Sequence, residues 1–167
     1  PLNYRWYENA GDKEYFNVYA SANYELNSHL NFFAEIQYRH IDYKIEGIHD
    51  DLNDITQSHN FDFWNPKGGI FYTINENNSA YFSAAYSNRE PNRDIYTDAD
   101  EIQRERVTHE KLIDYELGYS FRNRKTNINA NLFYMDYKDQ LVMTGEINNV
   151  GNTIMMNVDK SYRFGLE

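Results

Sequence analysis

The feature that most constrains the fold of this chain is a two-residue alternation of apolar and polar side chains. It is clearest between residues 16 and 26, where the odd positions are mostly polar. The even positions there hold Phe16, Val18, Ala20, Ala22, Tyr24 and Leu26. Because successive side chains of a β-strand point to opposite faces, this alternation predicts a strand with one apolar and one polar face.

The same alternation recurs along the chain and predicts seven strands. We expect these strands near residues 14–26, 30–45, 65–74, 79–89, 112–122, 127–141 and 157–167, with almost no helix. Turns of a few residues follow the first, third and fifth strands. Long polar loops, at 46–64, 90–111 and 143–156, follow the second, fourth and sixth strands. None of the apolar-face positions in the first six strands is charged, although 25% of all residues are charged.

Composition excludes several classes of protein. The formal net charge is −10 and no basic face is visible, which argues against a nucleic-acid partner. The absence of Cys removes disulfides, Cys zinc sites and Cys nucleophiles. No apolar run approaches the ~20 residues that a membrane helix needs, and no signal peptide is recognisable at the start. No grouping of nucleophile, His and acid suggests an enzyme, and no cofactor is expected.

A transmembrane β-barrel explains both the alternation and the connections. In hydrocarbon every backbone polar group must be paired, so the strands run antiparallel in a closed wall. Lipid-facing positions exclude charge. The connections at one membrane surface are short turns, whereas those at the other surface are long loops. We therefore interpret the fold as an all-β antiparallel meander that forms part of a barrel wall. A soluble antiparallel sandwich stays open as an alternative, but it does not explain the alternating loop lengths.

Several segments resemble motifs of the TonB-dependent outer-membrane receptors. Residues 65–72 resemble an Asn-Pro-Lys-x-Gly-x-x-Tyr strand opening, and residues 88–93 resemble an Arg-x-Pro loop entry. Residues 114–119 are similar to a Tyr-Glu-Leu-Gly-Tyr strand, and the strand after it is similar as well. Residues 157–167 resemble a final Asn-x-Gly to Gly-x-Glu element, with Asp159 where that pattern usually has Gly.

This resemblance implies the fold and function of a much longer protein. It implies a barrel of about 22 strands around an N-terminal plug. It also implies import of a scarce nutrient, such as a ferric chelate or haem, driven by the inner-membrane TonB complex. Residues 1–167 would then be a single segment of the barrel domain, in contact with outer-membrane lipid of a Gram-negative bacterium. The plug, which would contact TonB, and the remaining strands would lie outside this segment.

An isolated segment of this kind would have open sheet edges and an uncovered apolar face, so we expect it to self-associate. Two other functions fit the alternation alone. One is a soluble extracellular carbohydrate-binding β-domain, and the other is a passive porin. A plug-like domain upstream of Pro1 would select the receptor.

The long loops hold the candidate binding residues, because binding residues concentrate on loops. Arg89 and Arg93 could hold an anionic iron chelate through charge-assisted hydrogen bonds, although acidic neighbours compete for them. Tyr96 and Trp64 could stack on a flat or sugar-like ligand, or simply pack the base of a loop.

A metal site is a weaker hypothesis. His49, Asp50, Asp51 and His59 could supply nitrogen and oxygen ligands, but their spacing matches no known metal motif. A solvated acidic loop explains them with fewer assumptions. No metal is therefore assigned.

Overall fold

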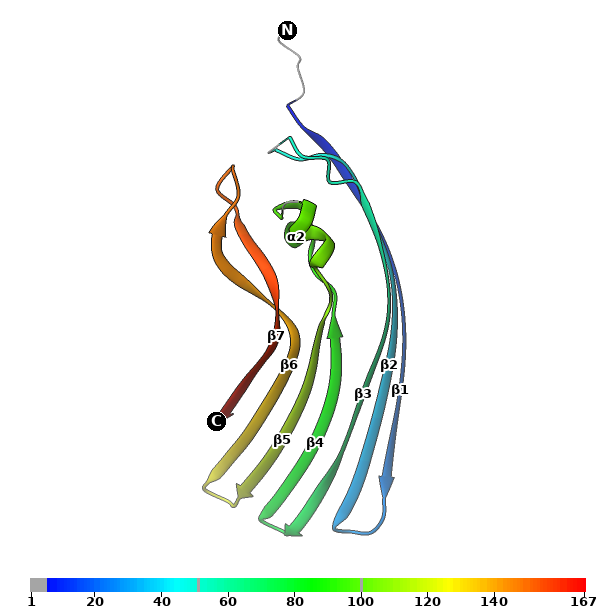
Figure 1. The fold of residues 1–167 in the computed structure, drawn as a ribbon. Coiled ribbons are helices and arrows are strands. Elements are labelled where there is room, and N and C mark those ends of the chain that lie inside the picture. The colour runs from blue at the N-terminus through cyan, green and yellow to red at the C-terminus, as the bar shows by residue number, and fades with distance from the viewer. Residues whose placement is uncertain (1–5, 51, 100) are drawn as a thin grey trace.

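The computed structural model describes residues 6–50, 52–99 and 101–167, which form one antiparallel sheet of seven strands (Figure 1). The strands are β1 (Glu8–Glu25), β2 (Leu30–Ile48), β3 (Gln57–Asn75), β4 (Asn78–Arg89), β5 (Glu110–Arg122), β6 (Asn127–Ile147) and β7 (Thr153–Leu166). Each strand pairs with the next in chain order, which confirms the predicted meander. Two short helices, α1 (Arg93–Thr97) and α2 (Glu101–Arg106), connect β4 to β5. Neither of these two described helices is long and apolar enough to cross a membrane.

The long connections differ from the prediction. β3 begins at Gln57 rather than near residue 65, so the irregular segment predicted at 46–64 is much shorter. β6 and β7 likewise extend into the segment predicted as a loop at 143–156. The loop between β4 and β5 contains α1 and α2, where no helix was expected.

The sheet curves around the two helices. Tyr96 of α1 stacks on His59 of β3, and both helices also contact β7. Because β3 and β7 are four strands apart in the sheet, one small helical unit reaches both only from the inside of a curve (Figure 1). We call this inner side the concave face and the opposite side the convex face. The ends of the sheet are named the long-loop end and the short-turn end.

The strand registers align side chains of one kind in rows across all seven strands. One convex row consists of Tyr24, Phe32, Ile70, Phe82, Leu117, Leu132 and Leu166. A concave row consists of Ser21, Glu35, Lys67, Ala85, Asp114, Met135 and Arg163. The convex row is not covered by another layer, since Leu117 is 51% exposed and Leu166 is 70% exposed. The predicted division into two faces is therefore confirmed, and the apolar face is the uncovered one.

The apolar positions change face partway along β2 and β3. From Leu30 to Tyr38 the apolar side chains of β2 are at even positions, on the convex face. Beyond Tyr38 they are at odd positions, and Ile41 and Ile45 are fully buried on the concave face. In this upper part of β2 the even positions are His40, Asp42, Lys44 and Glu46. This switch explains why the prediction missed the first eight residues of β3, where Phe61 and Phe63 are also at odd positions.

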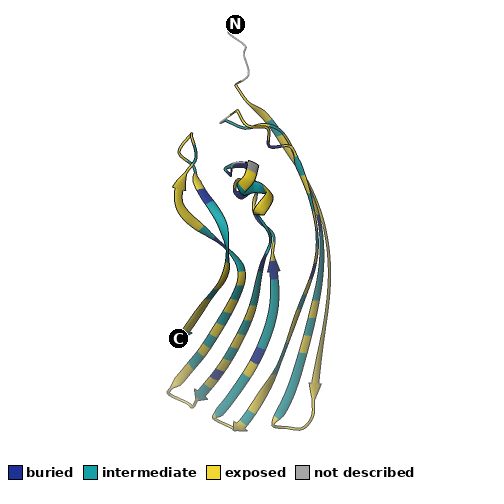
Figure 2. Cartoon of the chain, in the orientation of Figure 1, coloured by how far each residue is buried: buried dark blue, intermediate teal, exposed yellow. Residues whose placement is uncertain are grey.

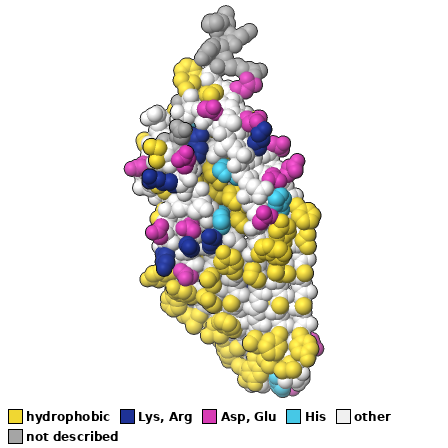
Figure 3. All heavy atoms as spheres, turned by 45° about the vertical axis from the view of Figure 1, so that its right-hand side comes forward, with side chains coloured by type: hydrophobic (Ala, Val, Ile, Leu, Met, Phe, Trp, Pro, Cys, Tyr) yellow, Lys and Arg dark blue, Asp and Glu magenta, His cyan; other side chains and the backbone are white. Residues whose placement is uncertain are grey.

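The convex apolar surface is therefore a band of limited height. Eight residue steps separate Leu30 from Tyr38, which is about 27 Å along the strand. Aromatic contacts mark its upper edge: the rings of Phe16 and Tyr38 are 6.5 Å apart, and those of Tyr38 and Trp64 are 4.8 Å apart. Figure 3 shows hydrophobic side chains gathered over the lower part of one face and charged side chains over the upper part. At a strand tilt of about 35–45° this length spans roughly 20 Å, close to the ~25 Å height of the apolar belt of a membrane barrel.

The backbone pairing between β3 and β4 ends at Pro66. The ladder runs from Asn75 and Asn78 up to Lys67 and Ala85, and the next β3 residue, Pro66, has no backbone N–H to donate. Side chains take over beyond it: the Asn88 backbone N–H donates to Asn65 Oδ1 (2.8 Å), and Asn88 Nδ2 donates to the Trp64 carbonyl (3.2 Å). β4 stays paired with β5 as far as Arg89, and the chain then turns into α1.

Three glycines on the concave face are each covered by an aromatic ring of the neighbouring strand. Gly69 faces Phe33, Gly118 faces Tyr81, and Gly165 faces Phe133. A Cβ on Gly118 would lie 1.9 Å from Tyr81 Cε1, and the Tyr81 hydroxyl also donates to Asn131 Oδ1 (3.1 Å). These aromatic–glycine pairs favour the local register, because any side chain at the glycine would clash with the ring.

The change of face predicts opposite effects of Arg at two adjacent positions of β2. Ile36→Arg places a charge in the convex band, at a cost of about 2 kcal/mol because Ile36 lies above the middle of the band. Gln37→Arg places the same charge on the polar concave face and should be tolerated. The measurement is the amount of heat-modifiable, folded full-length protein in the membrane. Equal losses for both variants would contradict the assignment of the faces.

The covered glycines predict a second stability effect. Gly118→Ala should destabilise the full-length protein by about 1–3 kcal/mol, because the Tyr81 ring must leave its place and its hydrogen bond. Gly68→Ala is the matched control, since its Cβ would meet only the Phe33 carbonyl oxygen at 3.5 Å. Urea-induced unfolding in lipid vesicles measures both variants. If Gly118→Ala were as stable as Gly68→Ala, the covering ring would have no role in packing.

Candidate functional site

The helices α1 and α2 form a folded unit because of local capping. Asn92 is the N-cap of α1, and its Oδ1 accepts a hydrogen bond from the Ile95 backbone N–H (3.2 Å). Asp94 lies in the first turn, where a carboxylate interacts favourably with the positive end of the helix. The Asp98 N–H donates to the Asp94 carbonyl (2.9 Å) and ends the helix. The same residues orient Ile95 and Tyr96 toward the sheet.

A small apolar core attaches this unit to the concave face. Ile45, Ile55 and Tyr96 are almost fully buried together, and Tyr43 and Val107 pack against them. The ring of Tyr96 stacks on His59 at 4.0 Å. Burial raises the pKa of Tyr96 far above its ordinary value, so its hydroxyl stays protonated. The switch of apolar side chains to the concave face thus serves to bury this unit (Figure 2).

A charged network holds the chain where it leaves β4. Glu90 accepts hydrogen bonds from Lys13 Nζ (3.1 Å) and from Arg39 Nη2 (2.9 Å). Burial alone would raise the pKa of Glu90. A hydrogen bond from its own backbone, the bond from Lys13 and the charge of Arg39 outweigh burial and keep the pKa below its ordinary value. Glu90, the first residue after β4, is therefore bound to both β1 and β2.

Three outer loops meet at Asp98. Its carboxylate lies 3.4 Å from His49 Nε2 and accepts from Asn152 Nδ2 (2.9 Å). These contacts join the β2–β3, β4–β5 and β6–β7 loops around a cavity of about 550 Å³. Asp94, Asn92 and Thr97 also line it, and its described lining residues include no Lys or Arg.

A second cavity, which we call the arginine cavity, lies on the concave face between β4, β5, β6 and β7. It has a volume of about 360 Å³ and is bordered by Arg89, Arg163, Tyr137, Gln140 and Asn88, among others. Arg89 forms an ion pair with the buried Glu110, whose Oε1 accepts from the Leu141 backbone N–H (2.6 Å). The Arg163 guanidinium lies 5.3 Å from the centroid of the Tyr137 ring. Two guanidinium groups and an aromatic ring beside one cavity suit an anionic, unsaturated ligand.

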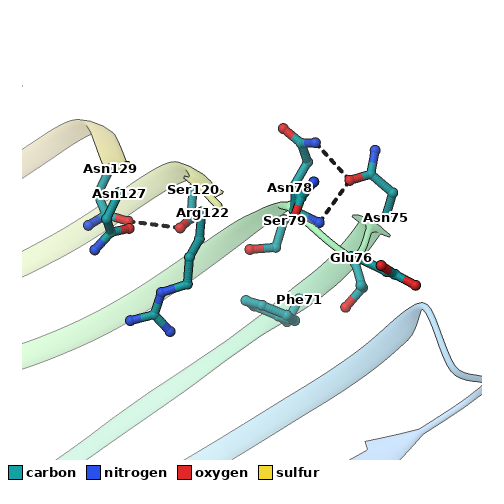
Figure 4. A pocket seen from close by; sticks show the side chains of 11 residues that line it. Phe71, Asn75, Glu76, Asn78, Ser79, Ser120, Arg122, Asn127 and Asn129 are labelled. Atoms are coloured by element: carbon teal, nitrogen blue, oxygen red, sulfur yellow. Dashed lines mark hydrogen bonds between the residues drawn. The ribbon is translucent and has the colours of Figure 1, made fainter. Parts of the chain in front are cut away.

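A third cavity, of about 430 Å³, lies at the short-turn end (Figure 4). Asn75 Oδ1 accepts from Asn78 Nδ2 (2.7 Å), and Ser120 Oγ donates to Asn129 Oδ1 (2.8 Å). Arg122 and Phe71 reach into the space between the two hairpins. These amide bonds mainly fix the turns, as is usual for Asn near strand ends.

The structure places the four predicted binding residues in different surroundings. Arg89 borders the arginine cavity. Arg93 donates to Asn9 of β1, and Tyr96 is buried in the core of the helical unit. Trp64 is not in a loop: it lies in β3 on the convex face, 56% exposed and against Tyr38. Sequence reasoning missed Arg163 and Tyr137. Both are at odd positions, whereas the apolar residues Leu132 and Leu166 are at even positions, so the alternation continued through these strands would have placed both on the polar face.

The predicted metal candidates do not converge. His49 Nε2 lies 3.2 Å from Asp50 Oδ1, whereas His59 stacks on Tyr96 elsewhere on the concave face. Asp51 lies outside the described residues. Among the described residues there is no group of three or more side chains suited to a metal ion.

One open, uncovered sheet with an apolar band and aromatic edges defines the class of the protein as a membrane β-barrel wall. The family model "TonB dependent receptor-like, beta-barrel" matches residues 1–167, and the chain belongs to this family. The soluble sandwich is thereby excluded. The family consists of transporters of the Gram-negative outer membrane rather than enzymes.

Solved structures agree with this fold. The ferric-catecholate import receptor Fiu from E. coli K12 superposes with a TM-score of 0.71 at 15% identity, over 95% of this chain and 25% of its own. The copper transporter OprC superposes with a TM-score of 0.77 at 9% identity, over 93% of this chain and 26% of its own. The FrpB iron transporter from Neisseria meningitidis superposes with a TM-score of 0.64 at 19% identity, over 96% of this chain and 24% of its own. The chain thus spans about a quarter of these proteins. Among curated proteins, no sequence matches it.

The buried core of the helical unit predicts the effect of removing Tyr96. Tyr96→Ala should weaken the attachment of α1 and α2 by roughly 3 kcal/mol, which corresponds to about a hundredfold faster amide exchange in residues 93–106. Ile102→Ala, at a side chain that is 65% exposed, is the control and should change little. Hydrogen–deuterium exchange of the full-length receptor in nanodiscs measures both. Unchanged exchange in Tyr96→Ala would show that the stacked ring does not anchor the unit.

Proposed function

We propose that the chain is one segment of the barrel domain of an outer-membrane receptor that binds and imports a scarce nutrient, a ferric chelate, haem or a similar compound. The observation that carries this proposal is the arginine cavity, where Arg89 and Arg163 border the same space on the concave face. Fiu and FrpB are named as a ferric-catecholate import receptor and an iron transporter, which supports an iron ligand by analogy.

The position of the arginine cavity fits an import route. It lies on the concave face below the loops that meet at Asp98, so a ligand entering past these loops would reach it next. Glu110 offsets one positive charge, since it pairs with Arg89. Arg163 keeps its charge available, because it forms no ion pair among the described residues and its guanidinium lies against the Tyr137 ring. The cavity is therefore net positive although the whole chain is acidic.

The remaining partners of this proposal lie outside the chain. A plug and further barrel strands would complete the receptor, and the plug would contact TonB. The convex band would contact outer-membrane lipid. An isolated segment would expose this band and its two edge strands to water, and we expect it to self-associate.

The test is iron uptake by full-length receptor in a strain that lacks its other iron receptors. Uptake is measured with a panel of radiolabelled ferric catecholates, ferric hydroxamates and haem. We expect one member of the panel to be imported, and Arg163→Gln and Arg89→Gln each to lower its binding at least about tenfold, as for loss of one charged hydrogen-bonding group.

Arg124→Gln, in the short turn between β5 and β6, is the control and should bind normally. Membrane abundance is measured for every variant. Import of a panel member with full activity in both cavity variants would contradict the role of the arginine cavity. Import of none of them would contradict the iron ligand.

A further inference from the structure

The cavity at the short-turn end is lined by a row of uncharged polar side chains. It lies between the β3–β4 and β5–β6 hairpins, and its volume of about 430 Å³ is in the usual range of small-molecule sites, about 300–1,000 Å³ (Figure 4). The registers place four of its lining residues level with one another across four strands: Thr73, Ser79, Ser120 and Asn129. Each is three residues from a member of the convex apolar row, so all four are on the concave face. We call this cavity the amide cavity.

The turns use only some of the polar groups of the amide cavity. Asn75 Oδ1 accepts from Asn78 Nδ2 (2.7 Å) and from the Asn77 backbone N–H (3.0 Å), which fixes the β3–β4 turn. Ser120 Oγ donates to Asn129 Oδ1, so the Asn129 Nδ2 group keeps both of its donors. Within the part of the chain that the structure describes, three further lining side chains form no hydrogen bond or ion pair: Ser79, Asn127 and Arg122. The cavity therefore presents unused donors and acceptors.

Phe71 adds an apolar surface to these polar groups. It is 43% exposed, and its ring and the Arg122 side chain both reach into the cavity (Figure 4). Arg122 and Glu76 are the charged lining residues, and their charges cancel. The amide cavity thus combines an aromatic ring with uncharged donors and acceptors at no net charge. This combination suits a neutral ligand that has an apolar face and a polar edge.

The position of the amide cavity limits which ligands reach it. The short turns of a membrane barrel are at the periplasmic surface. The cavity opens on the concave side of these turns, away from lipid, and the loops that meet at Asp98 are at the opposite end of the sheet. The polymer next to the periplasmic surface of a Gram-negative outer membrane is the cell wall, whose glycan consists of N-acetylated amino sugars. A sugar ring has a face of C–H groups and an edge of hydroxyls.

We propose that the amide cavity binds N-acetylated amino sugars of the cell-wall glycan. Phe71 stacks on the C–H face of a sugar ring. The acetamido group of the sugar offers one N–H and one C=O, which match the side-chain amides of Asn127 and Asn129. Arg122 and Ser79 donate to the sugar oxygens. The periplasmic end of the receptor is thereby attached to the wall, whichever nutrient the receptor imports.

The experiment uses full-length receptor in nanodiscs and measures its affinity for the tetramer of N-acetylglucosamine. The tetramer of glucose lacks the acetamido groups, and a stem peptide of the cell wall lacks the sugars. Co-sedimentation with protein-free cell-wall sacculi measures attachment to the wall itself. The variants are Phe71→Leu, which removes the flat ring, and Asn127→Ala, which removes one amide. Asn23→Ala is the matched control, since Asn23 is an exposed residue of the concave face in β1, outside the cavity.

We expect the wild type and Asn23→Ala to bind the N-acetylglucosamine tetramer and the sacculi alike. Phe71→Leu and Asn127→Ala should each bind the tetramer about three- to tenfold more weakly, as for the loss of one ring contact or one hydrogen bond. The glucose tetramer should bind to the wild type as weakly as the N-acetylglucosamine tetramer binds to these variants. Because the ligand is neutral, its affinity should not fall at high salt. Heat-modified mobility confirms that each variant is folded.

Four results would overturn the proposal. The first is equal affinity of both cavity variants and the control for the N-acetylglucosamine tetramer, or no binding by any of them. The second is equal binding of the glucose tetramer to the wild type, which would mean that the acetamido group is not recognised. The third is binding of the stem peptide through Phe71 and Asn127, which would mean a peptide site. The fourth is binding of the free tetramer without retention on sacculi, which would mean a site for a free sugar.

Discussion

The structure depends on the requirement that backbone polar groups be paired where no water can reach them. In hydrocarbon an unpaired N–H or C=O costs several kcal/mol, so each strand within the apolar band must bond to both neighbours. The ladders here satisfy this from β1 to β7 without interruption at the level of the Tyr24 to Leu166 row. Once the ladders are in register, the two-residue period decides which side chains meet lipid. The apolar surface on the convex face of the band therefore follows from the strand registers and the two-residue period.

Near the upper edge of the band this requirement is met by side chains. Pro66, opposite Ile36 of β2, ends the backbone pairing of β3 with β4, and beyond it the side chains of Asn65 and Asn88 complete the bonding. The apolar side chains of β2 and β3 then turn inward and bury Tyr96. The lower parts of these strands thus contact lipid, and their upper parts lie in water. The paired acidic residues of β2 and β3 lie just above the boundary between them.

The sequence predicts the strands within the band well, because the apolar side chains there recur every second residue without a change of face. It fails where the phase changes: Phe61 and Phe63 were assigned to a loop, and Trp64 to a binding surface, although all three are in β3. The helices α1 and α2 were missed because they are too short for an apolar period, although Asn92 is a recognisable N-cap. For the site, Arg89 was found at a strand end, but its neighbour in space, Arg163, is 74 residues away and only the register brings them together.

The most direct test of this account is the accessibility of single cysteines along β2. The chain has no Cys, so Cys can be placed singly at Phe32, Ile36, Ile41, Asp42 and Lys44 in a full-length receptor without other Cys. Spin labels at these positions in lipid vesicles are relaxed by oxygen in lipid and by a nickel chelate in water. We predict oxygen access at residues 32 and 36, nickel access at 42 and 44, and little of either at 41. Continued oxygen access at even positions through residue 44, or nickel access at residue 36, would contradict the change of face.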